Sequence, residues 1–388
     1  MRILVVNAGS SSLKLRLLGE DDELLQSEDI DDVDELESVV SKWGMPDAVG
    51  HRVVHGGTSF TSSVRIDESV IEKLNGLIEL APLHLPAALD GIQATGRIFP
   101  QVPAVACFDT AFHSTLPAAA ATYALPREWR ERWGLRRYGF HGLSHSYASR
   151  RAAELLGRKV EDLRLVTCHL GAGASLAAVK RGASVDTTMG FTPLEGLVMA
   201  TRSGTVDPGL LLWLQTAQEL SAAEISEALE HQSGLLGLSG NADMKEVARA
   251  GSAETALALD VYVHRLCAGV AAMAAAMGGL DAIVFTGGVG ENSPVVRERC
   301  LTLLEWLGCA VDGSANESAR GDAVISPSTA DVGTVVVSAR EDLEIAGEVR
   351  ELMDARAEGG NASLIPDLKC LDRQARTPLN GKEPARDK

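Results

Sequence analysis

Three basic side chains stand beside glycines in short loops of the sequence, where they can reach a bound anion. Arg52 lies in the run HRVVHGG, His141 in YGFHG and Arg202 in TRSG. The planar fork of an arginine matches carboxylate and phosphate groups in two-point contacts. A single loop arginine is more often one half of a surface salt bridge. Three such loops in a strongly acidic chain favour a shared site for an anionic substrate.

Three turns rich in small residues are suited to surround a phosphate group. They cover residues 7–12 (NAGSSS), 171–175 (GAGAS) and 286–292 (TGGVGEN). Without a Cβ, glycine lets backbone N–H groups approach phosphate oxygens closely. Each turn alone is explained equally well as a tight hairpin, but three exceed what packing needs. The third precedes a helix predicted to start near Pro294 and has no GxGxxG pattern, and the chain has no P-loop.

A carboxylate at the end of a buried strand is a candidate ligand for Mg²⁺. Asp109 directly follows an apolar run predicted as a strand over residues 102–108. A carboxylate in this place holds Mg²⁺ directly or through water, and the alternative is an Asp that caps the next turn. Two other polar residues have structural interpretations: His84 as a satisfied core histidine, and Asp207, in DPG, as part of a turn.

The elements that position these groups are strands and helices in alternation. A unit of strand, small-residue turn and strand occurs over residues 2–15 and again over 164–179. Further strands are predicted over 282–285 and 334–338, and helices over 67–78 (with Asp67 as N-cap), 83–94 and 341–353. The repeated unit predicts a duplicated architecture, in which two related lobes hold one nucleotide in the cleft between them.

Composition argues against several classes of protein. The chain has 388 residues, enough for two domains and a tail, and its formal net charge of −17 argues against binding to nucleic acid. The cysteines contain no C-x-x-C pair, which predicts reduced thiols of a cytoplasmic protein: Cys107, Cys168, Cys267, Cys300, Cys309 and Cys370. The N-terminal apolar run is too short for a signal peptide, and segment 266–280 is too short to span a membrane. We therefore expect a core helix there and a soluble protein without membrane association.

Several longer runs, taken together and in order, resemble the acetate kinase family. They are NAGSSSLK (7–14), HRVVHGG (51–57), APLH (81–84), FDTAFH (108–113), YGFHG (138–142), HLGAGAS (169–175), MGFTPLEGL (189–197), TRSGTVDP (201–208) and FTGGVGEN (285–292). The resemblance covers residues 1 to about 355. It implies an α/β fold of two duplicated ribonuclease H-like, actin-like ATPase domains with the active site in the cleft between them.

The resemblance also implies a domain division and an activity. The first lobe is expected to contain residues 1–113 and 343–356 and the second lobe residues 114–342, followed by a disordered tail over 357–388. The implied reaction is reversible, ATP- and Mg²⁺-dependent phosphorylation of acetate to acetyl phosphate by direct in-line transfer, on the route to acetyl-CoA, with Mn²⁺ as an alternative ion. A cytoplasmic homodimer is implied as well.

The family's functional residues carry over to positions of this sequence that match its motifs. The expected catalytic residues are Asp109, His141 and Arg202. Arg52 is expected to bind the substrate's carboxylate or phosphate, and the pocket for its methyl group is expected to contain Val54, Leu83, Phe140 and Pro193. The expected ATP/ADP contacts are Lys14, His169, Leu170, Gly171, Ala172, Gly173, Asp243, Met244, Lys245, Gly288, Val289, Gly290, Glu291 and Asn292. Asn7 and Glu341 are expected at the Mg²⁺ site.

Physical chemistry refines two of these roles. A carboxylate nucleophile is already ionised at pH 7, since such groups titrate near ~4, and it needs no general base. Our hypothesis is therefore that Asp109 positions Mg²⁺ or a water molecule rather than taking a proton. Val54 leaves room for acetate and crowds longer acids. Because one methylene is worth only ~1–3 kcal/mol, propionate is expected to be a poorer substrate and not an excluded one.

The sequence departs from the family pattern at several places. Ala172 replaces the usual Asn of the phosphate turn, and Lys245 replaces the usual Arg of the nucleotide segment. The neighbourhood of Glu341 (REDL) is also unusual, and the region between Lys14 and His51 is short. These differences bear on nucleotide affinity more than on the type of reaction.

Three other functions remain open from the sequence. A propionate or butyrate kinase would share these motifs, and a nucleotide-binding family member with impaired turnover would share most of them. An actin- or chaperone-like ATPase would not need the cluster of Arg52, His141 and Arg202. The sequence does not give the direction of flux.

Overall fold

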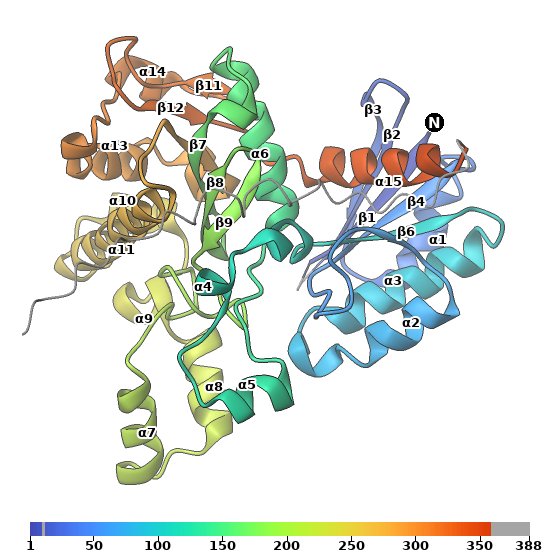
Figure 1. Ribbon diagram of the computed structural model, residues 1–388, viewed down its shortest axis with the longest axis horizontal. Helices are drawn as coiled ribbons and strands as arrows, with labels where there is room; N and C mark the ends of the chain where they lie inside the picture. Colours follow the sequence, from blue (N-terminus) through green and yellow to red (C-terminus); the bar gives the residue numbers. More distant parts are fainter. Residues whose placement is uncertain (10–11, 358–388) are drawn as a thin grey trace, which may run out of the picture.

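The computed structural model describes residues 1–9 and 12–357, which form two lobes that lie side by side (Figure 1). Each lobe is built on a six-stranded sheet, and the strands of the first sheet lie in the order β3-β2-β1-β4-β6-β5. These strands are β1 Ile3–Ala8, β2 Leu13–Leu18, β3 Leu24–Ile30, β4 Ala48–Val53, β5 Val64–Arg65 and β6 Ala104–Phe108.

The second sheet repeats the plan of the first, in the order β11-β12-β10-β7-β8-β9. Its strands are β7 Arg164–Leu170, β8 Ala174–Lys180, β9 Ala183–Thr187, β10 Ala282–Thr286, β11 Ala323–Val324 and β12 Gly333–Val336. In both sheets a central strand, β1 or β7, pairs antiparallel with the next strand and parallel with a crossover strand, β4 or β10. A short antiparallel strand, β5 or β11, closes the far edge. The predicted duplication of a ribonuclease H-like unit is confirmed.

The central strands are apolar along most of their length because helices cover both faces of each sheet. Helices α3 (Leu85–Ile98) and α15 (Glu341–Ala357) pack on the first sheet, and α6 (Gly142–Leu155) and α11 (Ala253–Met277) pack on the second. Along β1, Leu4 and Val6 share a buried cluster with Ala88 of α3, whereas Ile3 and Val5 share one with Ile345 of α15. Successive side chains of the strand thus serve opposite faces.

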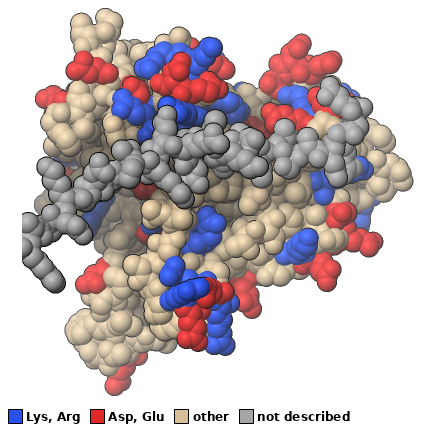
Figure 2. Space-filling view, in the orientation of Figure 1, with Lys and Arg blue, Asp and Glu red and all other residues tan. Residues whose placement is uncertain are grey.

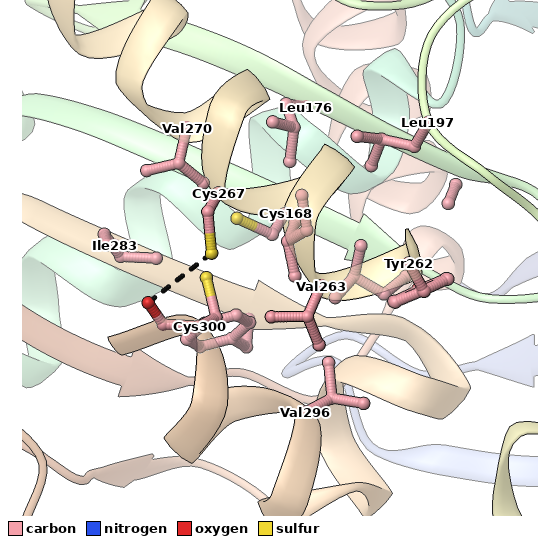
Figure 3. Close-up of a cluster of buried hydrophobic side chains, with 14 of the residues drawn as sticks. Cys168, Leu176, Leu197, Tyr262, Val263, Cys267, Val270, Ile283, Val296 and Cys300 are labelled. Carbon is pink, nitrogen blue, oxygen red and sulfur yellow. Dashed lines mark hydrogen bonds between the residues drawn. The ribbon is translucent and has the colours of Figure 1, made fainter. Parts of the chain in front are cut away.

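The largest buried cluster lies under the second sheet. Figure 3 shows side chains of β7, β10, α11 and α13 (Pro294–Leu303) meeting there, with the Cys267 thiol donating to the Cys300 carbonyl at 3.6 Å. Helix α11 is the one helix of the described residues that is long and apolar enough to cross a membrane. It packs against β7, β8 and β9, so the core helix expected over 266–280 is confirmed up to Met277, and Gly278 ends it. Every cysteine in the described part of the chain is a buried free thiol.

The chain crosses between the lobes twice. After β6 it leaves the first sheet and forms α6 on the second, and after β12 it returns to form α15 on the first. Helices α6 and α15 therefore pack against each other between the two sheets (Figure 1). Arg150 of α6 forms an ion pair with the buried Glu344 of α15 at this crossing.

One predicted helix start is confirmed, and two segments that were predicted as turns belong to helices. Helix α2 (Glu68–Asn75) begins as predicted, with the Asp67 carboxylate accepting a hydrogen bond from the Val70 N–H at 2.9 Å. Two predicted turns are wrong, since residues 287–292 form helix α12 (Gly287–Asn292) and Asp207 caps α7 (Pro208–Ala217). Gly287 has φ 79°, and a Cβ there would lie 2.9 Å from the Leu170 carbonyl oxygen. Glycine at 287 therefore allows close packing of α12 on β7.

The other helices complete the two lobes. They are α1 Leu36–Val40, α4 Ala118–Ala121, α5 Arg127–Trp133, α8 Ala222–His231, α9 Gly234–Ser239, α10 Met244–Ala250 and α14 Gly313–Ser318. The tail predicted for residues 357–388 lies, apart from Ala357 at the end of α15, outside the described residues.

Glu348 of α15 makes the stability of this fold depend on pH. Its carboxyl accepts a hydrogen bond from the Ser63 hydroxyl, and burial raises its pKa to about 7. The folded pKa thus lies above that of an unfolded glutamate, near ~4.3. The stabilisation by the bound proton is complete below the unfolded pKa and is lost as pH rises through 7.

We expect the free energy of unfolding to fall by about 1–2 kcal/mol between pH 5 and pH 8 through this group, allowing for its partial exposure. The variant Glu348→Gln should lose that part of the pH dependence in urea unfolding measured at both pH values. Glu351→Gln, an exposed position on the same helix, is the control. Equal pH dependence in wild type and Glu348→Gln would contradict the assignment.

Candidate active site

Residues at the carboxyl ends of the two central strands, Asn7 of β1 and His169 of β7, line one cavity from opposite lobes. In β1 and β2, Asn7 pairs with Lys14, and in β7 and β8, His169 pairs with Ser175 at the corresponding position. The Gly171 N–H closes its turn onto the Gly173 carbonyl at 2.9 Å. This cavity has a volume of about 600 Å³. Its lining from both lobes includes Asn7, Lys14, Arg52, His141, His169, Gly288, Glu291 and Glu341.

Arg52 on β4 is held by carboxylates on one side of this cavity. Its Nε lies 3.2 and 3.1 Å from the two Asp109 carboxylate oxygens, and one terminal nitrogen lies 2.6 Å from Oδ2. The other terminal nitrogen donates to Asn7 Oδ1 at 3.1 Å and lies 3.7 Å from Glu341. Burial raises the pKa of Asp109, and the Arg52 guanidinium opposes this rise. Asp109 is 1% exposed and directed at Arg52, so it fixes the guanidinium in place.

Asn7 and Glu341 offer oxygen ligands to a hard cation at the same wall. Asn7 Nδ2 donates to Glu341 Oε2 at 2.8 Å. Although burial raises the pKa of Glu341, Arg52, His169, Asn7 and Lys14 together hold it below its usual range. Among residues 1–9 and 12–357 no group of three His, Cys, Asp or Glu is arranged to hold a metal by itself. Mg²⁺ normally combines one or two carboxylates with substrate phosphates and water, so this amide–carboxylate pair fits a nucleotide-bound Mg²⁺.

Two histidines lie stacked on the second lobe's side. His141 has φ 57° just before α6, and its ring stacks on His169 with centroids 4.3 Å apart. His141 Nδ1 lies 2.9 Å from Ser175 Oγ, and His169 Nδ1 lies 2.7 Å from Ser144 Oγ. Burial lowers the pKa of both rings, with the Arg52 charge adding to the effect. Both imidazoles are therefore neutral near pH 7.

Arg202 reaches the same turn from a separate loop. A Cβ on Gly173 would lie 3.3 Å from an Arg202 terminal nitrogen and 3.4 Å from the His141 ring, so glycine here lets both groups meet. That nitrogen also donates to the Pro193 carbonyl at 3.2 Å. Burial lowers the pKa of Arg202. In the described part of the chain, Arg202 forms no ion pair with a carboxylate, which leaves its charge available to a bound anion.

A second cavity of about 890 Å³ adjoins the first, and Gly288 and Glu291 line both. The expected nucleotide-binding residues on its wall are Gly171, Ala172, Asp243, Met244, Lys245, Gly288, Val289, Glu291 and Asn292. Leu170 and Gly290 are buried behind this wall. Lys14 and His169 line the first cavity. The combined space thus has room for a phosphate chain in one part and a nucleoside in the other.

The expected methyl pocket is only partly assembled. Val54 and Phe140 belong to one buried cluster, and Pro193 is connected to Arg202 through its carbonyl. Leu83, by contrast, is 48% exposed. His84 is half-buried and not a core residue, and burial together with the Arg202 and Arg52 charges lowers its pKa to about 4. The interpretation of His84 as a satisfied core histidine is wrong.

Several polar residues around the site were not predicted. His145 and Ser175 contact each other and lie beside His141. Tyr262 lines the larger cavity, and its buried hydroxyl has no hydrogen-bond partner among the residues that the structure describes. The spacing of His141 and His145 was a usable signal, since residues four apart lie on one face of a helix. Ser175 and Tyr262 carry no comparable signal in the sequence.

Comparison with known proteins places this arrangement in a family. The model of the acetokinase family matches residues 30–347. The acetate kinase of Thermotoga maritima is 43% identical over 399 aligned residues, which cover 91% of this chain and 99% of that protein. The match therefore extends over both lobes.

Solved structures give the same result. The crystal structure of Porphyromonas gingivalis acetate kinase has a TM-score of 0.85 and 40% identity, covering 91% of this chain and 99% of that one. A propionate kinase from Francisella tularensis subsp. tularensis SCHU S4 has a TM-score of 0.83 and 37% identity, covering 89% and 98%. Similarity at this level extends to relatives named for either of two short acids.

Proposed function

Because this chain belongs to the acetokinase family, we propose that it catalyses the reversible transfer of a phosphoryl group between ATP and acetate, forming acetyl phosphate. It is a phosphotransferase with a carboxyl group as acceptor. The observation that carries the proposal is the meeting of Arg202 and His141 at the Gly173 turn, in a cleft that Arg52 lines from the other lobe.

The proposed mechanism is direct in-line transfer. Negative charge spreads over the equatorial oxygens of the migrating phosphoryl group, and fixed positive groups and N–H donors stabilise it without reorganising. Arg202 and His141 would contact those oxygens, and Arg52 would bind the acid's carboxylate or the acyl phosphate. Since acetate is already ionised, Asp109 takes no proton and holds Arg52 in position.

Mg²⁺, with Mn²⁺ as an alternative, would be held by Asn7 and Glu341 together with the nucleotide. When bound, it neutralises charge on the phosphate oxygens.

Lys14 and the 169–173 turn would bind the phosphate chain, and the nucleoside would occupy the larger cavity. Closure of the lobe of residues 1–113 and 343–356 onto residues 114–342 would exclude water from the reaction. Ala172 and Lys245 each remove a hydrogen-bonding group expected there, so we expect weaker nucleotide binding than in relatives that keep them.

The direct test is a hydroxamate assay with acetate, ATP and Mg²⁺. Formation of acetyl hydroxamate supports the proposal, and nucleotide binding without any product would indicate a member with impaired turnover. Propionate and butyrate measured in parallel distinguish the alternative acid kinases by kcat/KM.

The buried free thiols support a reducing compartment, and we propose the cytoplasm and a role in acetyl-CoA formation.

Substrate size provides a sharper prediction. Val54 is 5% exposed and packs in the same cluster as Phe140. Val54→Ala should increase the kcat/KM for propionate relative to acetate by about 10-fold, because it removes the methyl groups that crowd a longer acid. Substrate competition assays measure the ratio directly. A higher kcat/KM for propionate than for acetate in the wild type would contradict the pocket assignment.

We also propose a homodimer that forms through α7. None of its residues is buried, and Leu210, Leu212 and Trp213 are 46%, 62% and 52% exposed. The surface in this region carries few charged side chains in Figure 2. Burying one such side chain contributes about 1.5–3 kcal/mol, and a second copy of the same apolar helix would cover all three.

The double variant Leu212→Glu/Trp213→Glu should therefore halve the mass measured by light scattering after gel filtration. Trp306→Glu changes a tryptophan that is 71% exposed on another surface and should leave the mass at the dimer value. A wild-type monomer would refute the dimer, and a dimer that survives the double variant would exclude α7 as its interface.

A further inference from the structure

A continuous chain of hydrogen bonds leads from the second sheet to His141. Thr167 Oγ1 on β7 lies 2.7 Å from His145 Nδ1, and His145 Nε2 lies 2.8 Å from Ser175 Oγ on β8. Ser175 Oγ in turn lies 2.9 Å from His141 Nδ1. Thr167, His145 and Ser175 are all 0% exposed, so water cannot replace any of these bonds. The donor and acceptor in each hydrogen bond of the chain therefore determine the donor and acceptor in the next one.

The direction follows from the hydroxyl of Thr167. It has one hydrogen and two neighbouring atoms that can accept it, the ring nitrogen His145 Nδ1 at 2.7 Å and the Ala177 carbonyl oxygen at 3.5 Å. A hydroxyl donor favours a distance near ~2.7–2.8 Å, and 3.5 Å to the Ala177 carbonyl is long for such a bond, so the distances favour the hydrogen on the contact with His145. His145 then accepts at Nδ1 and donates from Nε2 to Ser175. Ser175, having accepted, gives its own hydrogen to His141 Nδ1.

The outcome at His141 matters because the ring is neutral. Burial and the charges of Arg52 and Arg202 oppose a second proton and hold the pKa of His141 well below its usual value. A neutral imidazole carries one N–H, and its tautomer decides whether the side facing the cavity donates or accepts. With Nδ1 accepting from Ser175, the hydrogen lies on Nε2, the atom that would be 3.4 Å from a Cβ on Gly173. Phosphate oxygens only accept, so only this tautomer can bind them.

We propose that His145 and Ser175 are positioning residues that hold His141 as the neutral Nε2–H tautomer, so that this N–H donates to the migrating phosphoryl group. The inference rests on the proposed kinase function for its role in catalysis. The tautomer assignment is argued from the contacts and not from the reaction, so the two are separable by experiment.

The fold contains a matched control in another buried histidine. His113 Nδ1 lies 2.8 Å from the hydroxyl of Ser184, which is 0% exposed. Its Nε2 lies 3.0 Å from the Phe140 carbonyl, which can only accept and therefore fixes the hydrogen on Nε2 without help from the serine. Ser184→Ala removes the same kind of bond as Ser175→Ala but leaves every tautomer unchanged.

We expect Ser175→Ala to lower kcat by about 10- to 100-fold with little change in KM, and Ser184→Ala to keep kcat within about threefold of wild type. Urea unfolding of both variants measures any common loss of stability. At position 145, Gln still places an N–H near Ser175 and should restore much of the activity that Leu abolishes. Equal losses of kcat in Ser175→Ala and Ser184→Ala would overturn the proposal.

The tautomer is read directly by ¹⁵N NMR of histidine-labelled wild-type protein. His141, assigned by its absence from His141→Gln, should show a protonated Nε2 and an unprotonated Nδ1, and Ser175→Ala should lose this preference. A protonated Nδ1 in the wild type would refute the relay whatever the kinetics show. Absence of any kinase activity together with a protonated Nε2 would instead refute the proposed function and leave the tautomer assignment standing.

Discussion

Replacing Arg202 with alanine is expected to lower kcat by about 10²–10³, with much smaller changes in the KM values for acetate and ATP. The guanidinium meets His141 at the Gly173 turn and forms no ion pair with a carboxylate in the described part of the chain. The positive charge of Arg202 therefore interacts most strongly in the transition state, where negative charge spreads over the oxygens of the transferring phosphoryl group. Steady-state kinetics in both directions measure the loss, which should be equal because the transition state is shared.

The same variant should not destabilise the fold. A buried charge without a partner costs free energy, so Arg202→Ala is expected to unfold at the wild-type urea concentration or above it. Arg202→Lys keeps the charge without the fork and should fall between wild type and alanine. Arg164→Ala removes an arginine that is paired with Asp281 far from the cavity, and kcat should survive it. A kcat for Arg202→Ala within a few-fold of wild type would contradict the assigned role.

Asp109→Asn is expected to lower kcat/KM for acetate by about 10²–10³ while the shape of its pH profile stays that of wild type. Both carboxylate oxygens are occupied by Arg52, so the amide loses the charge that orients the guanidinium. Removing one partner of a buried pair also destabilises by roughly 3–5 kcal/mol, which urea unfolding would detect. Loss of activity and loss of stability should therefore appear together here, in contrast to Arg202→Ala.

Asp281→Asn is the matched control, because Asp281 also binds an arginine, Arg164, through both of its oxygens. It should lose stability without the specific loss in kcat/KM. A changed pH profile in Asp109→Asn would show that this carboxylate exchanges a proton during the reaction. A changed Mg²⁺ dependence with Arg52 unaffected would instead return Asp109 to the metal-positioning role considered from the sequence.

Much of the frame of this site was predictable because local patterns determine it. Apolar runs that stop at small residues predicted the turns after β1 and β7, and the duplication followed from their repetition. Arg52 and Asp109 come at or just after the ends of neighbouring parallel strands, β4 and β6, which explains their contact. Asn7 and Glu341, however, are 334 residues apart, and only the family resemblance joined them.

The errors also have physical causes. Residues 287–292 were expected to form a small-residue turn after a strand. They form α12 instead, because close packing of α12 on β7 needs small residues and outweighs the low helix propensity of glycine. The assignment of Leu83 to the methyl pocket stays a prediction, and its 48% exposure depends on a loop that no pattern in the sequence positions. Ser175 and Thr167 were not predicted because their role depends on the hydrogen bonds of their buried hydroxyls to His145, and only the tertiary fold brings these residues together.

The double crossing of the chain has a consequence for biosynthesis. Ile345, Ala346 and Val349 of α15 complete a buried cluster with Ile3, Val5 and Val105 of the first sheet. A nascent chain that has left the ribosome up to the end of β6 therefore exposes an apolar sheet face whose cover, α15, is translated only after the whole second sheet. The apolar face of the first sheet stays exposed until α15 has been synthesised, so chaperones can bind this lobe for longer than the second lobe during synthesis.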